Sequence, residues 1–500
     1  MKSNILAGLS VLGLSVAAFV AVGCGDDSGA GGSGGSGGST TSTTTSSKAT
    51  GVTGATVTST VSTGTGMMGD GNDTFAEADP MEESMGVPFV ADSAELNPPD
   101  TDVDFYTFNG LAGVASIVAY SKPDGDPFAS TDPDIVFELY DSGMNLIATN
   151  DDPYPRDTQD SNIITVLPED GTYYLKVSEF CATPNAGCDA AYYDGLDDLT
   201  YGVEIYMEAA GALANPIQEA EPNDTVANAT PANLLETTTA GQYFATLAYG
   251  EFGSMTDTEY FSFTAPNNVP ITLGGRLTTN IVFQPPGKTA GSGSARFTGV
   301  VRLEDTMGNI VALQDWSTET DATDYAEITA APLEPGVNYV VRVTGGPNEA
   351  DGPLAPFFVY SHGVSEGNPL ETADVTNNLP ATPEVLVHPS GDTDSYFVDG
   401  NLGAGDTDHY QIAVEGQPMF AYTCIAQRGG SGIRGLTVDI LDAGGDVIST
   451  GTEDATTQLF VFDVDPMGET NLTVRITKTS QDALVTGDYY RCGFNFYTPQ

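Results

Sequence analysis

The sequence predicts an all-β protein in which three tandem β-sandwich domains follow a disordered N-terminal tether. Beyond residue 75, apolar residues alternate in short runs separated by Gly, Pro, Asn and Asp, which is typical of strands joined by tight turns. No long segment there has the apolar period of a helix. Three motifs also recur in the same order at near-constant spacing, and a period of domain size indicates tandem copies of one module.

The first motif places two acidic residues before an alternating aromatic strand. Its copies begin at Asp102, Asp257 and Asp406, so the intervals are 257 − 102 = 155 and 406 − 257 = 149 residues. Alternation with period two buries one face of a strand and exposes the other. The copies are residues 102–108 (DVDFYTF), 257–263 (DTEYFSF) and 406–412 (DTDHYQI).

Two further motifs follow the first in every copy. The second reads as strand, turn, strand, and its Asp and Gly or Asn residues supply the conformations of a tight hairpin turn. The third is a turn followed by an alternating strand. The second motif covers residues 139–147, 303–311 and 440–448, and the third covers residues 168–177, 333–343 and 465–476.

The N-terminus combines a basic start, an uncharged run and a cysteine. Lys2 precedes the uncharged residues 5–23, and small residues stand directly before Cys24. This order is that of a secretory signal, and its cysteine resembles the lipobox of bacterial lipoproteins, whose cysteine is lipidated after cleavage. We expect a signal peptide over 1–23, lipid on Cys24 and a disordered Gly/Ser/Thr-rich tether over 24–75. The alternative for residues 5–23 is a membrane-spanning helix.

The charge balance excludes one class of partner and favours one class of ion. The chain has 15 Lys+Arg against 69 Asp+Glu, so its formal net charge is 15 − 69 = −54. A chain this acidic repels phosphate backbones, so we expect no nucleic-acid partner. Acidic side chains suit hard cations such as calcium. The alternative is that most of these acids form only a solvated surface.

The cysteines indicate an oxidising compartment. With Cys24 lipidated, four cysteines remain, and they divide into two pairs within single expected domains. We expect the disulfides Cys181–Cys188 and Cys424–Cys492. A zinc site is the alternative, but CxxC spacing is absent and the chain has only three histidines.

The segments at which the modules begin also match in part: residues 219–225 read EAEPNDT, 77–80 read EADP and 366–369 read EGNP. Together with the three motifs, they resemble the bacterial pre-peptidase C-terminal domain. The resemblance covers nearly all of residues 77–500 as three copies, and the second copy fits best. It implies jelly-roll-like β-sandwiches, which we expect over residues 76–210, 215–363 and 364–500.

The same resemblance implies calcium at the entrance of a module. Several carboxylates and an amide carbonyl supply the oxygens that calcium prefers, whereas the alternative is that these acids only form turns. In the second module the expected ligands are Glu219, Glu221, Asn223, Asp224, Asp257 and Glu259. The counterparts with weaker motifs are Glu77, Asp79, Asp102 and Asp104 in the first module, and Glu366, Asn368, Asp406 and Asp408 in the third.

No catalytic constellation stands out in the sequence. There is no HExxH motif, no credible nucleophile elbow and no phosphate-binding glycine loop before a helix. His409 stands where the other copies of the strand have Phe105 and Tyr260, which favours packing over proton transfer. His362 lies at an expected module junction and His388 in a short entrance strand, and we expect no catalytic histidine because catalysis also needs an oriented partner. Tyr154, Tyr192 and Tyr193 are aromatic residues that could stack on a sugar or peptide, although ordinary loop tyrosines are the simpler interpretation.

We therefore expect a non-catalytic protein that is exported and anchored by lipid to the bacterial cell envelope, at the outer membrane or cell surface. Its partners would be the membrane, through the lipid, and an extracellular protein or polysaccharide. The first alternative is an accessory or substrate-targeting subunit of a secreted peptidase or other hydrolase. The second alternative is a hydrolase whose site the sequence does not reveal.

Overall fold

The computed structural model describes parts of residues 71–497. The described segments are 71–81, 89–99, 101–121, 133–150, 161–182, 199–209, 217–236, 241–252, 257–284, 299–315, 326–344, 357–372, 377–388, 395–414, 416, 418–453 and 458–497. The expected signal peptide, Cys24, residues 24–70 of the tether, Cys188 and the tyrosines 154, 192 and 193 lie outside them. Within these segments no helix has the length and apolar content needed to cross a membrane.

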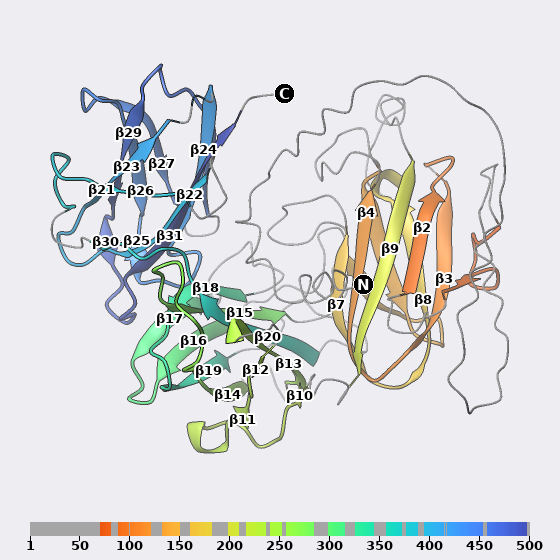
Figure 1. The fold of residues 1–500 in the computed structure, drawn as a ribbon. Helices are drawn as coiled ribbons and strands as arrows, with labels where there is room; N and C mark the ends of the chain where they lie inside the picture. The colour runs from red at the N-terminus through yellow and green to blue at the C-terminus, as the bar shows by residue number, and fades with distance from the viewer. Residues whose placement is uncertain are drawn as a thin grey trace, which may run out of the picture.

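The protein is nearly all β, as the sequence predicts, and its described strands form three sandwiches arranged in chain order (Figure 1). We call them modules 1, 2 and 3. Module 1 comprises β1 (Asp79–Pro80), β2 (Phe89–Glu95), β3 (Val103–Gly110), β4 (Gly113–Ser121), β5 (Ile135–Tyr140), β6 (Leu146–Asn150), β7 (Asn162–Leu167), β8 (Gly171–Glu179), the 3-10 turn η1 (Phe180–Ala182) and β9 (Thr200–Ala209).

Modules 2 and 3 continue the same series of elements. Module 2 comprises β10 (Ile217–Gln218), the 3-10 turn η2 (Val226–Asn228), β11 (Thr230–Pro231), β12 (Leu235–Glu236), β13 (Tyr243–Glu251), β14 (Thr258–Thr264), β15 (Leu277–Gln284), β16 (Val300–Asp305), β17 (Ile310–Asp315), β18 (Ala326–Pro332), β19 (Asn338–Thr344) and β20 (Phe357–Glu366). Module 3 comprises β21 (Glu384–Val385), β22 (Ser395–Asn401), β23 (Asp408–Ala413), β24 (Met419–Ile425), β25 (Ile433–Arg434), β26 (Thr437–Leu441), β27 (Val447–Thr452), β28 (Leu459–Val464), β29 (Asn471–Thr477), β30 (Ser480–Gln481) and β31 (Tyr489–Tyr497).

The three modules share one topology. Each has a five-stranded sheet, in the order β1-β3-β8-β5-β6, β11-β14-β19-β16-β17 or β21-β23-β29-β26-β27. Each has an opposing sheet whose matching orders are β2-β9-β4-β7, β13-β20-β15-β18 and β22-β31-β24-β28, with β10 and β12 added beside β13. The short first strand of the five-stranded sheet pairs in parallel with its neighbour in every module. β10 also pairs in parallel with β13, whereas the remaining pairings between neighbouring strands of these sheets are antiparallel.

The motifs found in the sequence form equivalent elements. The first motif supplies β3, β14 and β23, whose inward residues enter three separate apolar cores. The second motif forms the hairpins β5–β6, β16–β17 and β26–β27. At each hairpin one acid, Asp141, Asp305 or Asp442, accepts backbone N–H groups of the turn through a carboxylate oxygen. This is the turn chemistry that the Asp and Gly residues predict.

The expected disulfide Cys424–Cys492 is present. The two cysteines are direct partners on the neighbouring strands β24 and β31, and both are fully buried in the core of module 3. Cys181 is also disulfide-bonded, whereas its expected partner lies outside the described residues.

Two expected module boundaries differ from the packing that the structure shows. Residues 71–75, expected in the tether, pack on module 1, because the ring centroid of Phe75 lies 4.6 Å from that of Phe105 and 4.9 Å from that of Tyr140. The expected boundary at 363/364 falls inside β20, which pairs with β13 and β15 throughout.

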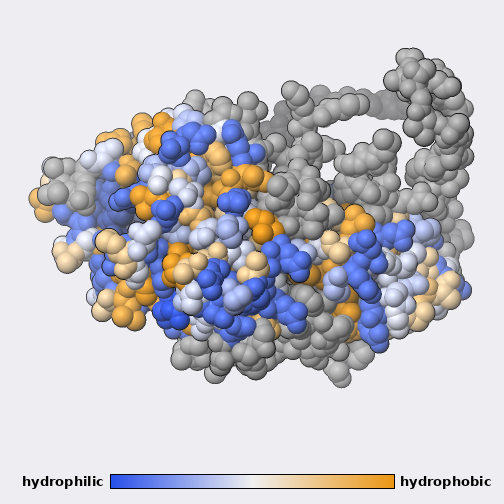
Figure 2. Space-filling model, turned by 90° about the horizontal axis from the view of Figure 1, so that it is seen from below, coloured by the Kyte–Doolittle hydropathy of each residue, from blue (hydrophilic) through white to orange (hydrophobic). Residues whose placement is uncertain are grey.

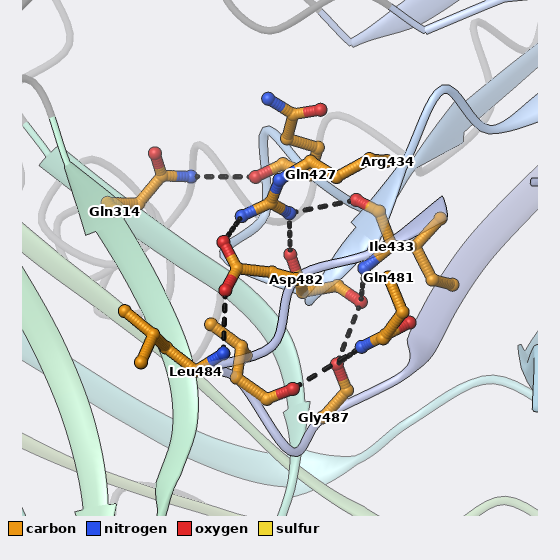
Figure 3. Close-up of polar contacts among 10 residues, drawn as sticks. Gln314, Gln427, Ile433, Arg434, Gln481, Asp482, Leu484 and Gly487 are labelled. Atoms are coloured by element: carbon orange, nitrogen blue, oxygen red, sulfur yellow. Dashed lines mark hydrogen bonds and ion pairs between the residues drawn. The ribbon is translucent and has the colours of Figure 1, made fainter. Parts of the chain in front are cut away.

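Modules 2 and 3 share an interface built from backbone hydrogen bonds. The carbonyls of Gly429 and Gly430 accept the N–H groups of Thr329, at 3.0 Å, and Leu313, at 2.8 Å. Tyr489 of module 3 packs in the core of module 2. Figure 3 shows Gln314 of β17 reaching the carbonyl of Gln427, beside the Arg434–Asp482 ion pair of module 3. A period in the sequence predicts separate modules, but these contacts join two of them.

The loop that makes this interface is held by one buried carboxylate. Glu453, 3% exposed, accepts the backbone N–H groups of Ala426, Gln427 and Arg428 at 2.8, 2.9 and 3.1 Å. Burial raises the pKa of Glu453 to about 7, although these hydrogen bonds and the Arg428 guanidinium act in the opposite direction. The carboxylate therefore positions the residues whose carbonyls face module 2.

Modules 1 and 2 touch through a smaller apolar cluster, which joins Val114 and Val166 of module 1 to Leu247, Tyr249 and Val359 of module 2.

The visible face of the molecule mixes hydrophilic residues with separate groups of apolar ones (Figure 2). Such a surface fits the strongly negative net charge of the chain.

We predict a pH dependence of stability from Glu453. The pKa of Glu453 in the folded protein, about 7, is higher than the value of about 4.3 expected in the unfolded chain. Protonation of Glu453 therefore stabilises the fold fully below about pH 4.3, and this stability is lost as the pH rises through about 7. Glu453→Gln should therefore reduce the drop in melting temperature between pH 5 and pH 8, measured by calorimetry. The exposed Asp446 provides a control, Asp446→Asn. An identical drop in wild type and Glu453→Gln would contradict the prediction.

Candidate metal centre

Each module places one fully buried acid at the same point of its five-stranded sheet. Asp104 on β3, Glu259 on β14 and Asp408 on β23 are each 0% exposed. Each stands two residues before the residue that pairs with the short parallel strand. The paired residues are Tyr106, Phe261 and Tyr410. The acid of the first motif therefore has one structural position in all three modules.

A buried asparagine precedes the short strand in each module at the same distance. The short strands begin at residues 79, 230 and 384. Counting back, 79 − 7 gives Asn72, 230 − 7 gives Asn223 and 384 − 7 gives Asn377, and these are 2%, 0% and 0% exposed. The backbone carbonyl of Asn72 accepts the N–H of Phe105 at 2.9 Å, and that of Asn377 accepts the N–H of His409 at 3.0 Å. In modules 1 and 3 the asparagine thus ties the entrance segment to the strand that bears the buried acid.

Module 2 gathers three carboxylates around this position. One oxygen from each of Glu219, Glu221 and Glu259 lies within 4.8 Å of the others. Glu219 follows β10, and its backbone N–H donates to Tyr249 at 2.9 Å. Gly250 leaves the space for it, because a Cβ at that residue would lie 2.1 Å from the Glu219 carboxyl carbon. The pairing of β10 with β13 therefore places the Glu219 carboxylate near that of Glu259.

The oxygens of this cluster are satisfied unequally within the described part of the chain, because Glu219 and Glu221 accept N–H groups whereas the innermost acid does not. Both carboxylate oxygens of Glu259 are buried without a hydrogen bond, and so is the Oδ1 of Asn223. Asn223 instead donates its backbone N–H to Glu221 at 2.9 Å and its Nδ2 to Glu219 at 3.3 Å. A buried carboxylate without a donor is costly unless a proton or a cation satisfies it.

The pKa values of Glu259 and Glu219 are raised, as expected for carboxylates withdrawn from water without a cation. Burial, followed by the nearby Glu219, raises the pKa of Glu259 to about 9. Burial also raises the pKa of Glu219. Three carboxylates and an amide oxygen form an all-oxygen donor set without histidine or cysteine, which suits calcium and disfavours zinc. The residues present therefore fit a hard divalent cation.

Two of the six expected ligands of module 2 form a separate pair. The exposed Asp224 has a raised pKa, first because of its hydrogen bond with Asp257. Asp257 also accepts the N–H of Thr258 at 3.0 Å. The structure thus brings together Glu219, Glu221, Asn223 and Glu259, with Asp224 and Asp257 at the margin of the cluster.

Modules 1 and 3 satisfy the equivalent acid with tyrosine hydroxyls. In module 3 Tyr490 donates to Asp408 at 2.6 Å and lies 2.5 Å from the hydroxyl of Tyr410, which donates to Glu371 at 3.1 Å. In module 1 the hydroxyl of Tyr201 donates to Asp104 and lies 2.8 Å from that of Tyr106.

The equivalent residues of module 2 have no hydroxyl. Phe261 takes the place of Tyr410, and Phe358, opposite Gly250, takes the place of Tyr490, opposite Gly400. The ring centroids of Phe261 and Phe358 lie 6.0 Å apart. The missing hydroxyls leave Glu259 and Glu219 facing each other.

The weaker expected ligands bind groups of the protein itself. The carboxylates of Glu77 and Asp102 accept Thr74 Oγ1 at 2.7 Å and the Asn97 N–H at 2.6 Å. The Glu366 carboxylate accepts backbone N–H groups of residues 272–275, which belong to module 2. These hydrogen bonds lower the pKa of Glu366. The remaining three are the exposed Asp79 on β1, Asn368, whose N–H donates to Asp399 at 3.1 Å, and Asp406, which accepts the Thr407 N–H at 3.0 Å. Within the described segments, only the module 2 cluster joins three metal-ligating side chains.

Sequence reasoning missed the true entrance residues of modules 1 and 3. Asn72, not Glu77 or Asp79, corresponds to Asn223, and Glu371 corresponds to Glu219 because its N–H also donates to the opposing strand, at Asp399. The signal available was the repeated Asn-Asp-Thr at 72–74 and 223–225. For Glu371 no equivalent signal exists, since its surrounding sequence differs.

The three histidines lie in packed positions. His362 is 2% exposed between Thr279 Oγ1 at 2.6 Å and the Tyr360 hydroxyl at 3.0 Å, and burial lowers its pKa to about 3. The Nδ1 of His409 donates to the carbonyl of Asn377 at 3.0 Å, and that of His388 to the carbonyl of Ser395 at 2.8 Å. None of these contacts pairs a histidine with a carboxylate.

Comparisons with known proteins give similarities of structure only. No family model matches the chain, and no curated protein matches it. Among solved structures, it is similar to the tandem CBM51 modules of a family 98 glycoside hydrolase from Streptococcus pneumoniae, at 9% identity over 53% of this chain and 88% of that one, with a TM-score of 0.15. It is also similar to the CUB1-EGF-CUB2 domains of human MASP-1/3, at 9% identity over 50% and 98%, with a TM-score of 0.15. The tandem CBM22 domains of a Paenibacillus barcinonensis protein match at 11% identity over 52% and 94%, with a TM-score of 0.14.

We predict that the tyrosine hydroxyls stabilise module 3. Tyr490→Phe removes the donor to the buried Asp408 and should lower the free energy of unfolding by about 1.5–3 kcal/mol, the usual range for a hydrogen bond to a charged group. Tyr422→Phe is the matched control, because its hydroxyl lies 3.1 Å from the neutral Ser449 hydroxyl and should matter less. Equal effects of the two substitutions in denaturant titrations would contradict this account.

Proposed function

We propose that this protein is an exported, non-catalytic lipoprotein that presents three β-sandwich modules at the cell envelope to bind an extracellular polymer, with calcium holding the entrance of module 2. The observation that carries the proposal is the carboxylate cluster of Glu219, Glu221 and Glu259, whose innermost member is fully buried against a second acid with no cation of the described residues beside it. The resemblance to the pre-peptidase C-terminal domain is part of the proposal.

The proposed binding role is supported by the structural roles of the acidic and histidine side chains. Among the described residues, Asp141 holds a turn, Asp408 joins a hydroxyl network and His362 is packed between hydroxyl groups. A bound cation would neutralise the cluster and join the segment after β10 to the start of β14. The entrance segment would then be fixed to its sandwich, as the tyrosine networks fix the equivalent segment in module 3.

Calcium should stabilise the protein through module 2. A ligand that binds only the folded state adds about 2.7 kcal/mol at a hundredfold excess over Kd. We expect calcium to raise the melting temperature of the mature protein relative to chelator, and Glu259→Gln to abolish this rise. Glu334→Gln, an exposed acid in a turn of the same module, is the control and should keep it. Superimposable wild-type curves with calcium and with chelator would refute the calcium site.

The anchor is tested at its cysteine. Cys24→Ser removes the thiol that receives lipid, so metabolic labelling with a radioactive fatty acid should be lost. The protein should then leave the membrane fraction or accumulate as an uncleaved precursor. Lipid labelling that persists in Cys24→Ser would overturn the lipoprotein assignment.

A further inference from the structure

The outer face of the five-stranded sheet of module 2 carries two arginines side by side. Arg342 on β19 and Arg302 on β16 are direct cross-strand partners. Tyr260 on β14 is the partner of Arg342 on its other side, and the guanidinium carbon of Arg342 lies 5.6 Å from the centre of the Tyr260 ring. The row therefore reads aromatic ring, cation, cation across three neighbouring strands.

The same row in the other modules contains an ion pair. In module 1, Lys176 on β8 is the partner of Glu138 on β5, with Nζ and Oε2 2.5 Å apart. In module 3, Arg475 on β29 is the partner of Asp439 on β26, with Nη2 and Oδ2 2.6 Å apart. Arg302 therefore occupies the position where both other modules have a carboxylate.

Neither arginine of module 2 has a polar partner within the described residues. The Nε of each is buried without a hydrogen bond, and no carboxylate pairs with either guanidinium. Glu304, two residues along β16 from Arg302, makes no ion pair with them. Like charges directly opposite on neighbouring strands destabilise a sheet. Because acids outnumber Lys and Arg by 69 to 15, two adjacent unpaired cations are a marked exception in this chain.

We propose that Arg302 and Arg342 bind the carboxylate of a uronate residue in an acidic polysaccharide, an inference that rests on the proposed binding function and names its ligand class. Two guanidinium groups on directly opposite residues of neighbouring strands offer several N–H donors, and each guanidinium can match a carboxylate in the bidentate manner. The Tyr260 ring attracts the Arg342 guanidinium, which lies over it, through a cation–π contact. The bound anion replaces the carboxylate that Glu138 and Asp439 supply in the other modules.

The position of the pair favours a polysaccharide over an acidic peptide. An extended peptide usually adds to an open sheet edge through its backbone. β19 and β16 lie inside the sheet, with their backbones already paired on both sides. The same outer face carries the half-buried hydroxyl residues Thr258, Ser262 and Thr344 beside the cations. Hydroxyls next to a carboxylate site match the pattern of a uronate ring, which bears both groups.

The test measures binding of short oligogalacturonates to the mature protein by calorimetry. Arg302→Glu recreates the ion pair of modules 1 and 3, so the fold should be retained, as its melting temperature will report. We expect this variant to bind at least tenfold more weakly than wild type. Lys176→Gln, which removes a paired cation from the same row of module 1, should leave binding unchanged.

Each comparison arm supports the proposal or overturns it. Neutral dextran oligomers should not bind, and added salt should weaken uronate binding because the contact is ionic. Unchanged uronate affinity in Arg302→Glu, or tighter binding of oligoglutamate than of the uronate, would overturn the proposal. The uronate titrations are repeated in chelator and in calcium to separate this proposal from the metal site. If uronate binds with the same affinity in both and calcium does not raise the melting temperature, only the calcium proposal is refuted.

Discussion

One constraint recurs through the protein: a carboxylate buried where the entrance segment meets the first long strand of a sandwich must have a partner. Asp104, Glu259 and Asp408 occupy this position and are fully buried. In two modules tyrosine hydroxyls from the opposing sheet satisfy the acid, which connects the two sheets as well as the entrance. In module 2 phenylalanines replace the tyrosines, and a second and a third carboxylate come close instead. One structural position thus supports either a hydrogen-bonded network or a cluster of three carboxylates.

The outer faces of the same sheets follow a similar rule. In modules 1 and 3, a cation on β8 or β29 forms an ion pair with an acid on the neighbouring strand β5 or β26. The charge of the cation is therefore balanced within the protein. Module 2 substitutes Arg302 for the acid, so its row is left open to an external anion. The central module is therefore the one in which both the inner acid and the outer cation lack internal partners among the described residues. The repeat provides its own controls, because modules 1 and 3 show the closed form of each arrangement.

The modules are not three independent units. Hydrogen bonds from β17 and β18 to the loop 426–430, with Tyr489 inserted in the neighbouring core, join modules 2 and 3. Glu453 keeps that loop in place by accepting three backbone N–H groups. The outer face of module 2 that carries Arg302 and Arg342 is therefore joined to module 3 through the same sandwich. The contact between modules 1 and 2 is a smaller apolar cluster.

The sequence by itself determined the all-β class, the three-fold repeat, the hairpins and the Cys424–Cys492 pairing, because alternation, turn residues and a constant period are local properties of a chain. It also identified Glu219, Glu221, Asn223 and Glu259 as neighbours. It did not reveal that Glu371 corresponds to Glu219. Alignment of the second motif shows Arg302 where the other copies have Glu138 and Asp439, but not that this position faces the cation of the neighbouring strand. Those relations depend on strand register and on which residues face each other across sheets. Tertiary structure alone decided them, because contacts between residues tens of positions apart leave no fixed spacing in the sequence.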